Sequence, residues 1–231
     1  KDIRLKCLRM VSAKTFKEDP LRILRVFSLR AILDFRIEPR TLKQVKKDQN
    51  LIVDVSAERI REELFKILDT ERAAVILKEM DKIALLEKII PHVGMMVNCP
   101  QGGYHHLDVW AHSLETVVQL DKVLNEVKEC PELSDYLDEP VGSAHSRRSV
   151  LKLAALLHDI GKPKTKKIEK ERTSFHGHEH VGKSIVRSIA KILKLSTNER
   201  FVLEDMVLRH LRPGYLSNFK IPTERSLYRY F

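Results

Sequence analysis

The segment Leu151–Pro163 limits most strongly what this chain can fold into. Apolar residues in this segment and directly before it recur at helical spacing, at positions 150, 151, 153, 154, 157 and 160. This spacing predicts a helix with one buried face. His158 and Asp159 follow at the C-terminal end of that helix. Gly161 then allows a close approach of two backbones, and Pro163 ends the helix.

A neutral imidazole and a carboxylate on neighbouring residues can bind one divalent cation. A single His-Asp pair also occurs where polar residues merely close a core helix, so the other histidines matter. His112 lies upstream in another stretch of helical apolar spacing, and His176, His178, His180 and His210 lie downstream. Their distribution favours a metal centre built from several helices.

These residues resemble the HD phosphohydrolase superfamily over residues 104–215. The resemblance rests on His112, on the segment from His158 to Pro163, on Gly177-His178-Glu179 and on His210. It implies a helical bundle with five metal ligands, His112, His158, Asp159, His178 and His210. It also implies catalytic roles for Asp159 and Lys162, with Lys162 holding a phosphate. His105 and His106 are weaker candidates for the wall of the pocket.

The chemistry implied is hydrolysis of a phosphomonoester or phosphodiester, because a bound divalent ion lowers the pKa of its water towards neutrality. Mixed His and Asp ligands fit Mg, Mn, Ni, Fe or Zn, and the sequence does not choose among them. The family's last Asp ligand normally lies further downstream, and no Asp follows Asp205. The metal site of this chain is therefore expected to be incomplete.

A second candidate site lies near the start of the chain. Asp19, Arg22 and Arg25 recur every three residues and so share one face near the start of a predicted helix. A carboxylate accepts from an exocyclic amine, and a guanidinium donates to the ring nitrogen beside it. The pair therefore matches cytosine and adenine and clashes with guanine and uracil. The alternative is a plain N-cap at Asp19 with an ion pair to Arg22.

The segments Glu18–Arg25, Leu33–Leu42 and Val55–Leu64 resemble class II tRNA nucleotidyltransferases, the family of CCA-adding enzymes and poly(A) polymerases. The resemblance spans residues 1–90. It implies addition of C and/or A to tRNA 3′ ends, with tRNA, ATP and CTP as partners. Asp19 and Arg22 would read the incoming base, with Arg25 and Arg59 in supporting roles.

The family's polymerase head, with its Gly-Ser loop and Asp-x-Asp pair, would precede Lys1. The chain starts with Lys, and its last residues from Thr223 onwards have a helical pattern. We therefore expect a fragment that carries the base-reading surface and cannot polymerise alone. Two alternatives stay open: a free-standing HD phosphohydrolase, and an RNA-binding accessory chain with an inactive HD site.

Composition narrows the partners and the compartment expected for this chain. The formal net charge is +10, and two basic ends flank an acidic segment over residues 73–145, which suggests a polyanionic partner such as RNA. The three cysteines are far apart in the sequence, as expected for reduced thiols in the cytoplasm. No apolar run approaches the roughly 20 residues that cross a bilayer, so we expect no membrane partner. The sequence does not reveal the oligomeric state.

The predicted fold is all-α, with a nucleotidyltransferase neck and body over residues 1–91 and an HD-type helical bundle over residues 92–231. Within it we expect a short amphipathic helix over residues 2–17 and helices over residues 70–91. Residues 128–148 are predicted to form a loop insertion, and residues 164–172 a solvated loop rather than a hairpin. Ser196 and Glu199 predict a capping box at the start of a helix ending at His210.

Overall fold

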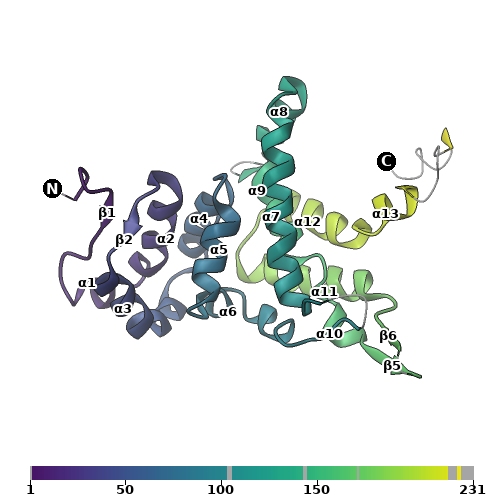
Figure 1. The fold of residues 1–231 in the computed structure, drawn as a ribbon, viewed down its shortest axis with the longest axis horizontal. Coiled ribbons are helices and arrows are strands. Elements are labelled where there is room, and N and C mark those ends of the chain that lie inside the picture. Colours follow the sequence, from purple (N-terminus) through teal and green to yellow (C-terminus); the bar gives the residue numbers. More distant parts are fainter. Residues whose placement is uncertain (1, 103–105, 143–144, 171, 218–222, 225–231) are drawn as a thin grey trace.

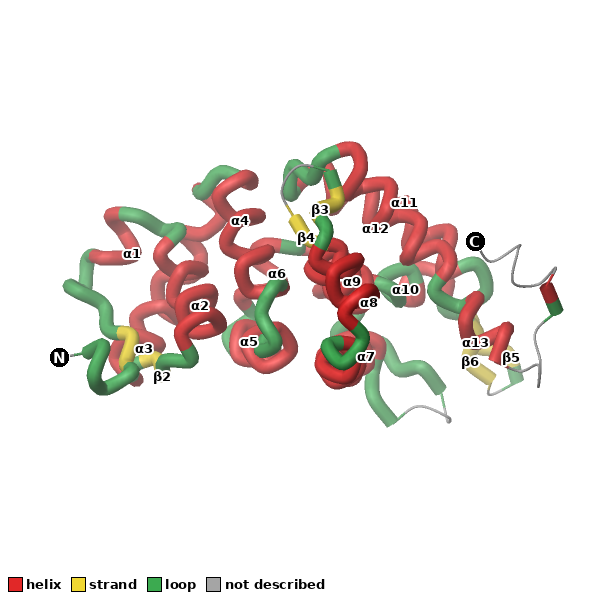
Figure 2. The backbone as a smooth tube through the Cα atoms, turned by 90° about the horizontal axis from the view of Figure 1, so that it is seen from above, coloured by secondary structure: helices red, strands yellow, loops and turns green. Residues whose placement is uncertain are grey.

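The computed structural model describes residues 2–102, 106–142, 145–170, 172–217 and 223–224. Helices dominate, and the strands form only three short pairs among these residues. The all-α prediction is therefore confirmed. The elements follow one another along the long axis of the molecule, so that the first six α-helices lie on one side of α7 (Val109–Val127) and the last helices on the other (Figures 1 and 2).

The first part of the chain is a stack of short helices. Its elements are α1 (Thr15–Glu18), α2 (Arg22–Leu33), α3 (Pro39–Asp48), the 3-10 helix η1 (Gln49–Asp54), α4 (Ala57–Leu68), α5 (Ala73–Asp81), α6 (Leu85–Ile89) and the 3-10 helix η2 (Pro91–Met95). Strand β1 (Cys7–Leu8) pairs in parallel with β2 (Arg36–Ile37). The predicted helical stretch over residues 70–91 corresponds to α5 and α6.

The second part is a bundle around α9. Its elements are α7, α8 (Pro131–Asp138), α9 (Arg147–Leu157), α10 (Lys162–Thr165), α11 (His178–Ile192), α12 (Thr197–Arg209) and α13 (Arg212–Ser217). Two antiparallel pairs complete it, β3 (Pro140–Val141) with β4 (His145–Ser146) and β5 (Lys167–Glu169) with β6 (Arg172–Ser174). Ser196 and Glu199 form the predicted capping box at the start of α12.

The predicted helix over residues 2–17 is wrong. Residues 7 and 8 pair with residues 36 and 37 as strands, and Lys6 has a φ of 46°, a left-handed conformation that an α-helix does not tolerate. Only Thr15–Glu18 is helical there. Local propensity suggested a helix, but the backbone hydrogen bonds to a segment about 30 residues away determine the structure.

Three further expectations need correction. The N-cap position of α2 is Leu21, without a side-chain cap, because the carboxylate of Asp19 is turned towards Arg59. Residues 128–148 contain α8 and strands β3 and β4 where a loop was expected. Residues 164–172 contribute to α10 and to an exposed β5–β6 hairpin rather than to a solvated loop alone.

The core is continuous from α2 to α12. The apolar stripes of α2 and α4 are buried, namely Leu21 just before α2, Leu24, Phe27 and Ala31 on α2, and Ile60, Leu64, Ile67 and Leu68 on α4. Helix α7 packs against α5 on one side and α9 on the other, and α9 also contacts α4. Helix α9 is therefore held from several sides, and this fixes the position of His158 and Asp159 at its end.

Polar groups also join the two parts of the chain. His145 is buried and stacks on the ring of Phe65, with ring centroids 3.7 Å apart. Its Nδ1 lies within hydrogen-bond distance of Glu199, a buried residue of α12. The Glu199 carboxylate also accepts from the backbone N–H of Ser196 at 2.7 Å. One carboxylate thus anchors α12 both to its own N-terminus and to β4.

The Glu199 carboxylate is expected to make stability depend on pH. Burial alone would raise its pKa, but the hydrogen bonds from Ser196 and His145 more than offset this, and the pKa lies below its ordinary value. A lowered folded-state pKa contributes stability that is complete above the unfolded-state pKa of 4.5 and is lost as the pH falls through the folded-state value.

Glu199→Gln should therefore cost roughly 1–3 kcal/mol near pH 7 and flatten the loss of stability below pH 4.5. Urea unfolding between neutral and acidic pH measures both effects. Glu132→Gln, a change at an exposed residue in the first turn of α8, is the matched control. If the free energy of unfolding of Glu199→Gln fell at acidic pH as steeply as that of the wild type, this assignment would be contradicted.

Candidate metal centre and base-reading groove

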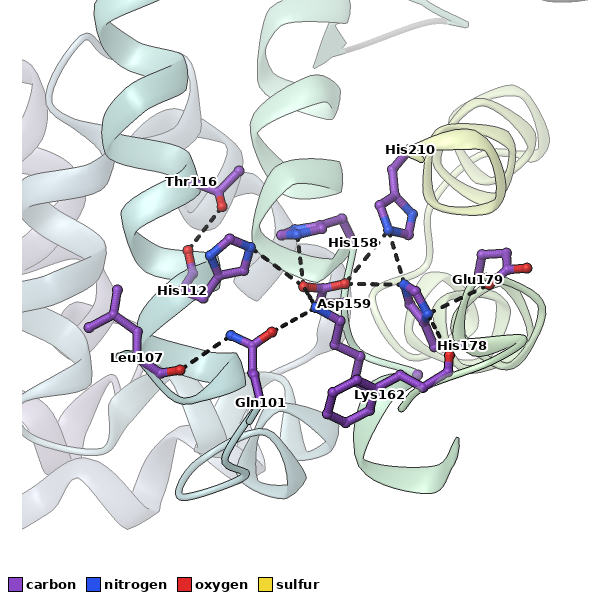
Figure 3. A network of polar contacts seen from close by, with 12 residues as sticks. Gln101, Leu107, His112, Thr116, His158, Asp159, Lys162, His178, Glu179 and His210 are labelled. Atoms are coloured by element: carbon purple, nitrogen blue, oxygen red, sulfur yellow. Dashed lines mark hydrogen bonds and ion pairs between the residues drawn. The ribbon is translucent and has the colours of Figure 1, made fainter. Parts of the chain in front are cut away.

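Asp159 is the centre of a cluster of histidines at the end of α9. Its side chain is buried, with 2 % of the residue exposed. The Oδ2 atom lies 3.1 Å from His158 Nε2 and 3.5 Å from His112 Nε2. The Oδ1 atom lies 3.3 Å from His178 Nε2 and 3.6 Å from His210 Nε2. Figure 3 shows the four rings arranged around this one carboxylate.

These five residues come from four different elements, α7, α9, α11 and the end of α12. They form two groups that share Asp159, and in each group the potential ligand atoms lie within 4.8 Å of one another. The structure thus brings together every residue that the sequence proposed as a ligand. Their binding of metal stays a prediction, which the geometry favours.

Three of the rings are oriented by the backbone. The Nδ1 atoms of His158, His178 and His210 lie 2.8, 2.8 and 2.7 Å from the carbonyl oxygens of Ala155, Phe175 and Val207. With Nδ1–H donating to a carbonyl, Nε2 is the atom of each ring that faces Asp159. Metal-binding histidines in proteins are usually fixed in this way.

The cluster keeps Asp159 ionised. Burial alone would raise the pKa of its carboxyl group, but hydrogen bonds from His158, His178 and His210 hold that pKa well below its usual range. For His178, burial alone would lower the pKa of the ring, yet the nearby Asp159 carboxylate and the Phe175 carbonyl raise it. An ionised carboxylate among imidazoles is the donor set that divalent cations such as Zn, Ni, Fe and Mn accept.

Lys162 reaches into the same cluster from the first turn of α10. Its Nζ lies 2.7 Å from Asp159 Oδ2 and donates to Gln101 Oε1, also at 2.7 Å. Gln101 is buried, and its amide donates to the carbonyls of Leu107 and Asp108. Gln101 could not be predicted from the sequence, because a glutamine in a Gly-containing loop carries no spacing signal.

Two grooves open beside the cluster. The larger, of about 770 Å³, is lined by His112, His158 and His210 together with apolar residues of α7 and α9 and with Met206 and Arg209 of α12. The smaller, of about 450 Å³, is lined by Lys162, Phe175, His178 and Glu179 among others. Each groove therefore gives access to part of the cluster.

The other histidines named from the sequence are not among the two groups around Asp159 in the described part of the chain. His106 is exposed, and His105 lies outside the described residues. His176 lines the smaller groove. The His180 side chain is 75 % exposed, although it lies only two residues from His178. Helical periodicity explains this difference, since positions two apart on a helix face different directions.

Gly161 provides the close backbone approach that the sequence predicted. A Cβ atom at this position would lie 2.0 Å from the His178 carbonyl oxygen and 2.6 Å from the Gly182 nitrogen. Both are backbone atoms of α11, which cannot move aside as the end of a side chain can. The glycine thus allows α11 to carry His178 up to Asp159.

Gly161→Ala is expected to destabilise the fold by roughly 3 kcal/mol, the upper part of the range for overpacking, because α11 must shift. Gly214→Ala is the matched control, since a Cβ there would meet no atom within 4 Å. Urea unfolding of the two variants measures the difference. Equal stabilities would show that α11 does not pack as described.

The second candidate site lies between α1, α2 and α4. Arg59 Nη2 donates to Asp19 Oδ1 at 3.1 Å, and Arg22 Nε lies 3.8 Å from Asp19 Oδ2. Arg22 also donates to the carbonyl of Thr15 at 3.4 Å. Arg25 Nε donates to Glu63 Oε1 at 3.3 Å. Asp19 is therefore in contact with two of the predicted arginines, Arg22 and Arg59, while Arg25 shares a groove wall with Arg22.

A groove of about 430 Å³ adjoins this group. Arg22, Arg25 and Glu18 line it, together with apolar side chains that include Met10, Phe16, Val26 and Leu29. Glu63, which the sequence analysis did not single out, is 2 % exposed and also accepts from Ser28 and Lys66. A buried carboxylate thus fixes Arg25 on the wall of the groove.

Comparison with known protein families gives two matches along the chain. Residues 34–96 match a family described as the probable RNA- and SrmB-binding site of polymerase A, and residues 109–225 match the HD domain. No helix among the described residues is long and apolar enough to cross a membrane.

Among curated proteins, the A-adding tRNA nucleotidyltransferase of Deinococcus radiodurans is 33% identical over 204 residues, covering 84% of this chain and 42% of the relative. The CC-adding tRNA nucleotidyltransferase of Thermus thermophilus is 30% identical over 237 residues, covering 100% of this chain and 48% of the relative. The chain thus spans a little under half the length of these relatives.

Among solved structures, a tRNA-processing enzyme with CTP superposes with a TM-score of 0.64 at 18% identity, covering 100% of this chain and 51% of the other. This agreement supports the fold. The relatives confirm the resemblance to tRNA nucleotidyltransferases that the Glu18–Arg25 segment indicated. Because the HD model matches more than half of its residues, the chain belongs to the HD domain family.

Proposed function

We propose that this chain is the base-reading and HD-bearing part of a tRNA nucleotidyltransferase that adds C and/or A to tRNA 3′ ends. The observation that carries the proposal is the Asp19–Arg22 pair, fixed by Arg59 beside a groove. The relatives named A-adding and CC-adding tRNA nucleotidyltransferase support it. The partners proposed are tRNA, CTP and ATP.

The chemistry of the pair selects the base. The Asp19 carboxylate accepts from the exocyclic amine of cytosine or adenine, and the Arg22 guanidinium donates to the adjacent ring nitrogen. Guanine and uracil present a carbonyl to the carboxylate and an N–H to the guanidinium. Arg59 holds the Asp19 carboxylate in place, and Arg25, held by Glu63, adds positive charge beside Arg22.

Nucleotidyl transfer itself requires carboxylates that hold two metal ions at the primer 3′-hydroxyl and the triphosphate. In the family that the chain resembles, these carboxylates belong to a polymerase head. In this proposal the described residues supply base selection and, through the basic surface of the chain, contacts to the tRNA backbone.

Variants of the full-length gene product test the selection. Asp19→Ala and Arg22→Ala should each reduce the incorporation of CMP and AMP into tRNA by roughly 100-fold, the cost of losing a charged hydrogen-bond pair to the substrate. Both variants should also show a smaller preference for CMP and AMP over GMP and UMP. Arg30→Ala is the matched control, since Arg30 lies on α2 but pairs with Asp34 and Glu79. Unchanged preference in Asp19→Ala would refute the role of the pair.

For the HD domain we propose metal-dependent hydrolysis of a phosphate ester, such as a 2′,3′-cyclic or 2′-phosphate end. His112, His158, Asp159, His178 and His210 would hold the divalent ion, and their donor atoms fit this role because they converge on one carboxylate. When bound, the ion supplies an activated water and neutralises charge on the phosphate. Lys162 contributes a fixed positive charge that orients the phosphate, with Gln101 holding the ammonium in position.

A further inference from the structure

The β5–β6 hairpin and the residues just before it are strongly basic. Residues 164–172 hold five basic and two acidic side chains. Four of the basic residues are exposed and Lys166 is half-buried; the five are Lys164, Lys166, Lys167, Lys170 and Arg172. The hairpin projects from the end of the molecule that is remote from α1 to α3 (Figure 1). Its positive charge therefore lies on an ordered element that stands out from the helical bundle.

The charge of the hairpin is not neutralised within the described part of the chain. None of its five basic side chains forms an ion pair with a described carboxylate. The arginines of α9, α11 and α12, by contrast, all have a carboxylate partner; they are Arg147, Arg148, Arg187, Arg200 and Arg209. Uncompensated like charges on one short element repel one another, and an anionic partner removes that repulsion.

Strand pairing determines which of these side chains act together. Lys167 lies opposite Ser174, and Glu169 lies opposite Arg172. Because opposite residues and alternate residues share a face, Lys167 and Arg172 lie on the same face of the hairpin. Each strand has three residues, a length of about 10 Å, which is the rise of about three stacked nucleotides. The hairpin is thus long enough to contact several successive phosphates.

The hairpin leads into the smaller groove beside the candidate metal centre. Strand β5 follows α10, which begins at Lys162, and only residues 175–177 separate β6 from α11, which begins at His178. Thr173 and Ser174 of β6 line the smaller groove, as do Lys162 and His178. The end of a chain bound along the hairpin is therefore brought to the groove that Lys162 and His178 share.

Two ring side chains lie between the hairpin and the metal centre. Phe175 and His176 are half-buried and both line the smaller groove, and the centre of the Phe175 ring is 5.4 Å from Lys162 Nζ. Proteins that bind single-stranded nucleic acids combine positive charge along the backbone with rings on which bases stack. An acidic peptide would match the charge alone, whereas single-stranded RNA matches the charge and the rings.

We propose that the β5–β6 hairpin is a docking surface for single-stranded RNA, and that it guides the phosphate-bearing end of an RNA chain into the smaller groove. The substrate of the HD domain is then the end of an RNA rather than a free nucleotide. This identity of the substrate rests on the proposed metal-dependent hydrolysis, whereas the docking of RNA on the hairpin does not.

Hydrolysis of two substrates by the full-length gene product tests the docking. One is a single-stranded RNA of about ten nucleotides, a common size for single-strand sites, that ends in a 2′,3′-cyclic phosphate; the other is the matching nucleoside 2′,3′-cyclic phosphate. The double variant Lys167→Gln with Lys170→Gln should raise KM for the RNA roughly 10-fold, as expected for the loss of two exposed ion pairs, without changing kcat. Both constants for the nucleoside should keep their wild-type values.

The dependence on salt and two matched variants complete this test. The slope of log kcat/KM for the RNA against log salt concentration should become shallower by about 1.4 in the double variant, or about 0.7 for each lost phosphate contact. Lys191→Gln with Lys194→Gln removes the same charge from exposed residues at the far end of α11 from His178 and should leave KM unchanged. Lys167→Arg with Lys170→Arg keeps the charge and should retain the wild-type KM.

Three results would overturn the docking surface. They are an unchanged KM for the RNA in the glutamine variant of the hairpin, an equal rise of KM in the variant at the end of α11, and an unchanged salt slope.

Crosslinking without hydrolysis separates this proposal from the proposed hydrolase. In the presence of a chelator, the same RNA with 4-thiouridine near its 3′ end is crosslinked to the full-length gene product by ultraviolet light, and mass spectrometry identifies the attached residues. We expect attachment within residues 164–176 and its loss in Lys167→Gln with Lys170→Gln. Such attachment in a protein that hydrolyses no phosphate ester would refute the hydrolase and leave the RNA surface in place.

Attachment only outside residues 164–176 would overturn the docking surface, whether or not the protein hydrolyses phosphate esters. An excess of unlabelled RNA should abolish the attachment. If a polyglutamate peptide abolished it and unlabelled RNA did not, the surface would fit an acidic protein and the proposal would be wrong.

Discussion

Asp159→Asn is expected to reduce metal-dependent hydrolysis of phosphate esters by roughly 10³-fold, a loss of about 4 kcal/mol of transition-state stabilisation. Asparagine keeps the shape of the side chain but removes the negative charge on which His112, His158, Lys162, His178 and His210 converge. Both the affinity for the divalent ion and the position of Lys162 depend on that charge.

The measurement is phosphate or nucleotide release from a nucleoside 2′,3′-cyclic phosphate and from a nucleoside 2′-phosphate, with and without a chelator. Asp135→Asn is the matched control, because Asp135 is an exposed carboxylate of α8. If Asp159→Asn hydrolysed these esters as fast as the wild type, the HD centre would not be the source of the activity. If neither protein hydrolysed them, these esters would not be substrates.

Lys152→Ala is expected to have the largest effect on stability. Lys152 is 1 % exposed, and its Nζ lies 2.7 Å from Asp121 Oδ1 and donates to the Thr70 carbonyl at 2.7 Å. Asp121 Oδ2 in turn accepts from the backbone N–H of Ala74. The pair thus connects α9, α7 and the start of α5, where the two parts of the chain meet.

Removing one partner of a buried pair leaves the other charge without compensation, which typically costs about 3–5 kcal/mol. Urea unfolding of Lys152→Ala should show a loss of this size. The double variant Lys152→Met with Asp121→Leu removes both charges and should recover most of it. A loss below about 1 kcal/mol in Lys152→Ala, or no recovery in the double variant, would contradict this description of the pair.

The candidate ligands were named from the sequence through the resemblance to the HD superfamily, because one His-Asp pair or one helical histidine is a weak signal by itself. Local spacing predicted only that His112, His158 and His210 lie on helices, which a bundle can bring together. Gly161 was predicted to allow a close approach, and α11 is the backbone that approaches. The sequence alone could not assign each ring to one oxygen of Asp159.

Contacts between distant segments were not predictable from local patterns. Gln101 reaches Lys162 across 61 residues, and Glu63 reaches Arg25 across 38; neither has a spacing that suggests its partner. The helix prediction for residues 2–17 was wrong for the same reason, because Cys7 and Leu8 pair with β2 despite their helical periodicity. The spacing suggested Asp19 as an N-cap, yet its carboxylate accepts from the guanidinium of Arg59 instead.

The most direct measurement is the mass of a tRNA lacking its 3′-terminal residues after incubation with the full-length gene product and all four nucleoside triphosphates. The proposed function predicts products extended by C, by A, or by both, and by no other nucleotide. Extension by G or U at a comparable rate, or no extension of the tRNA, would contradict it.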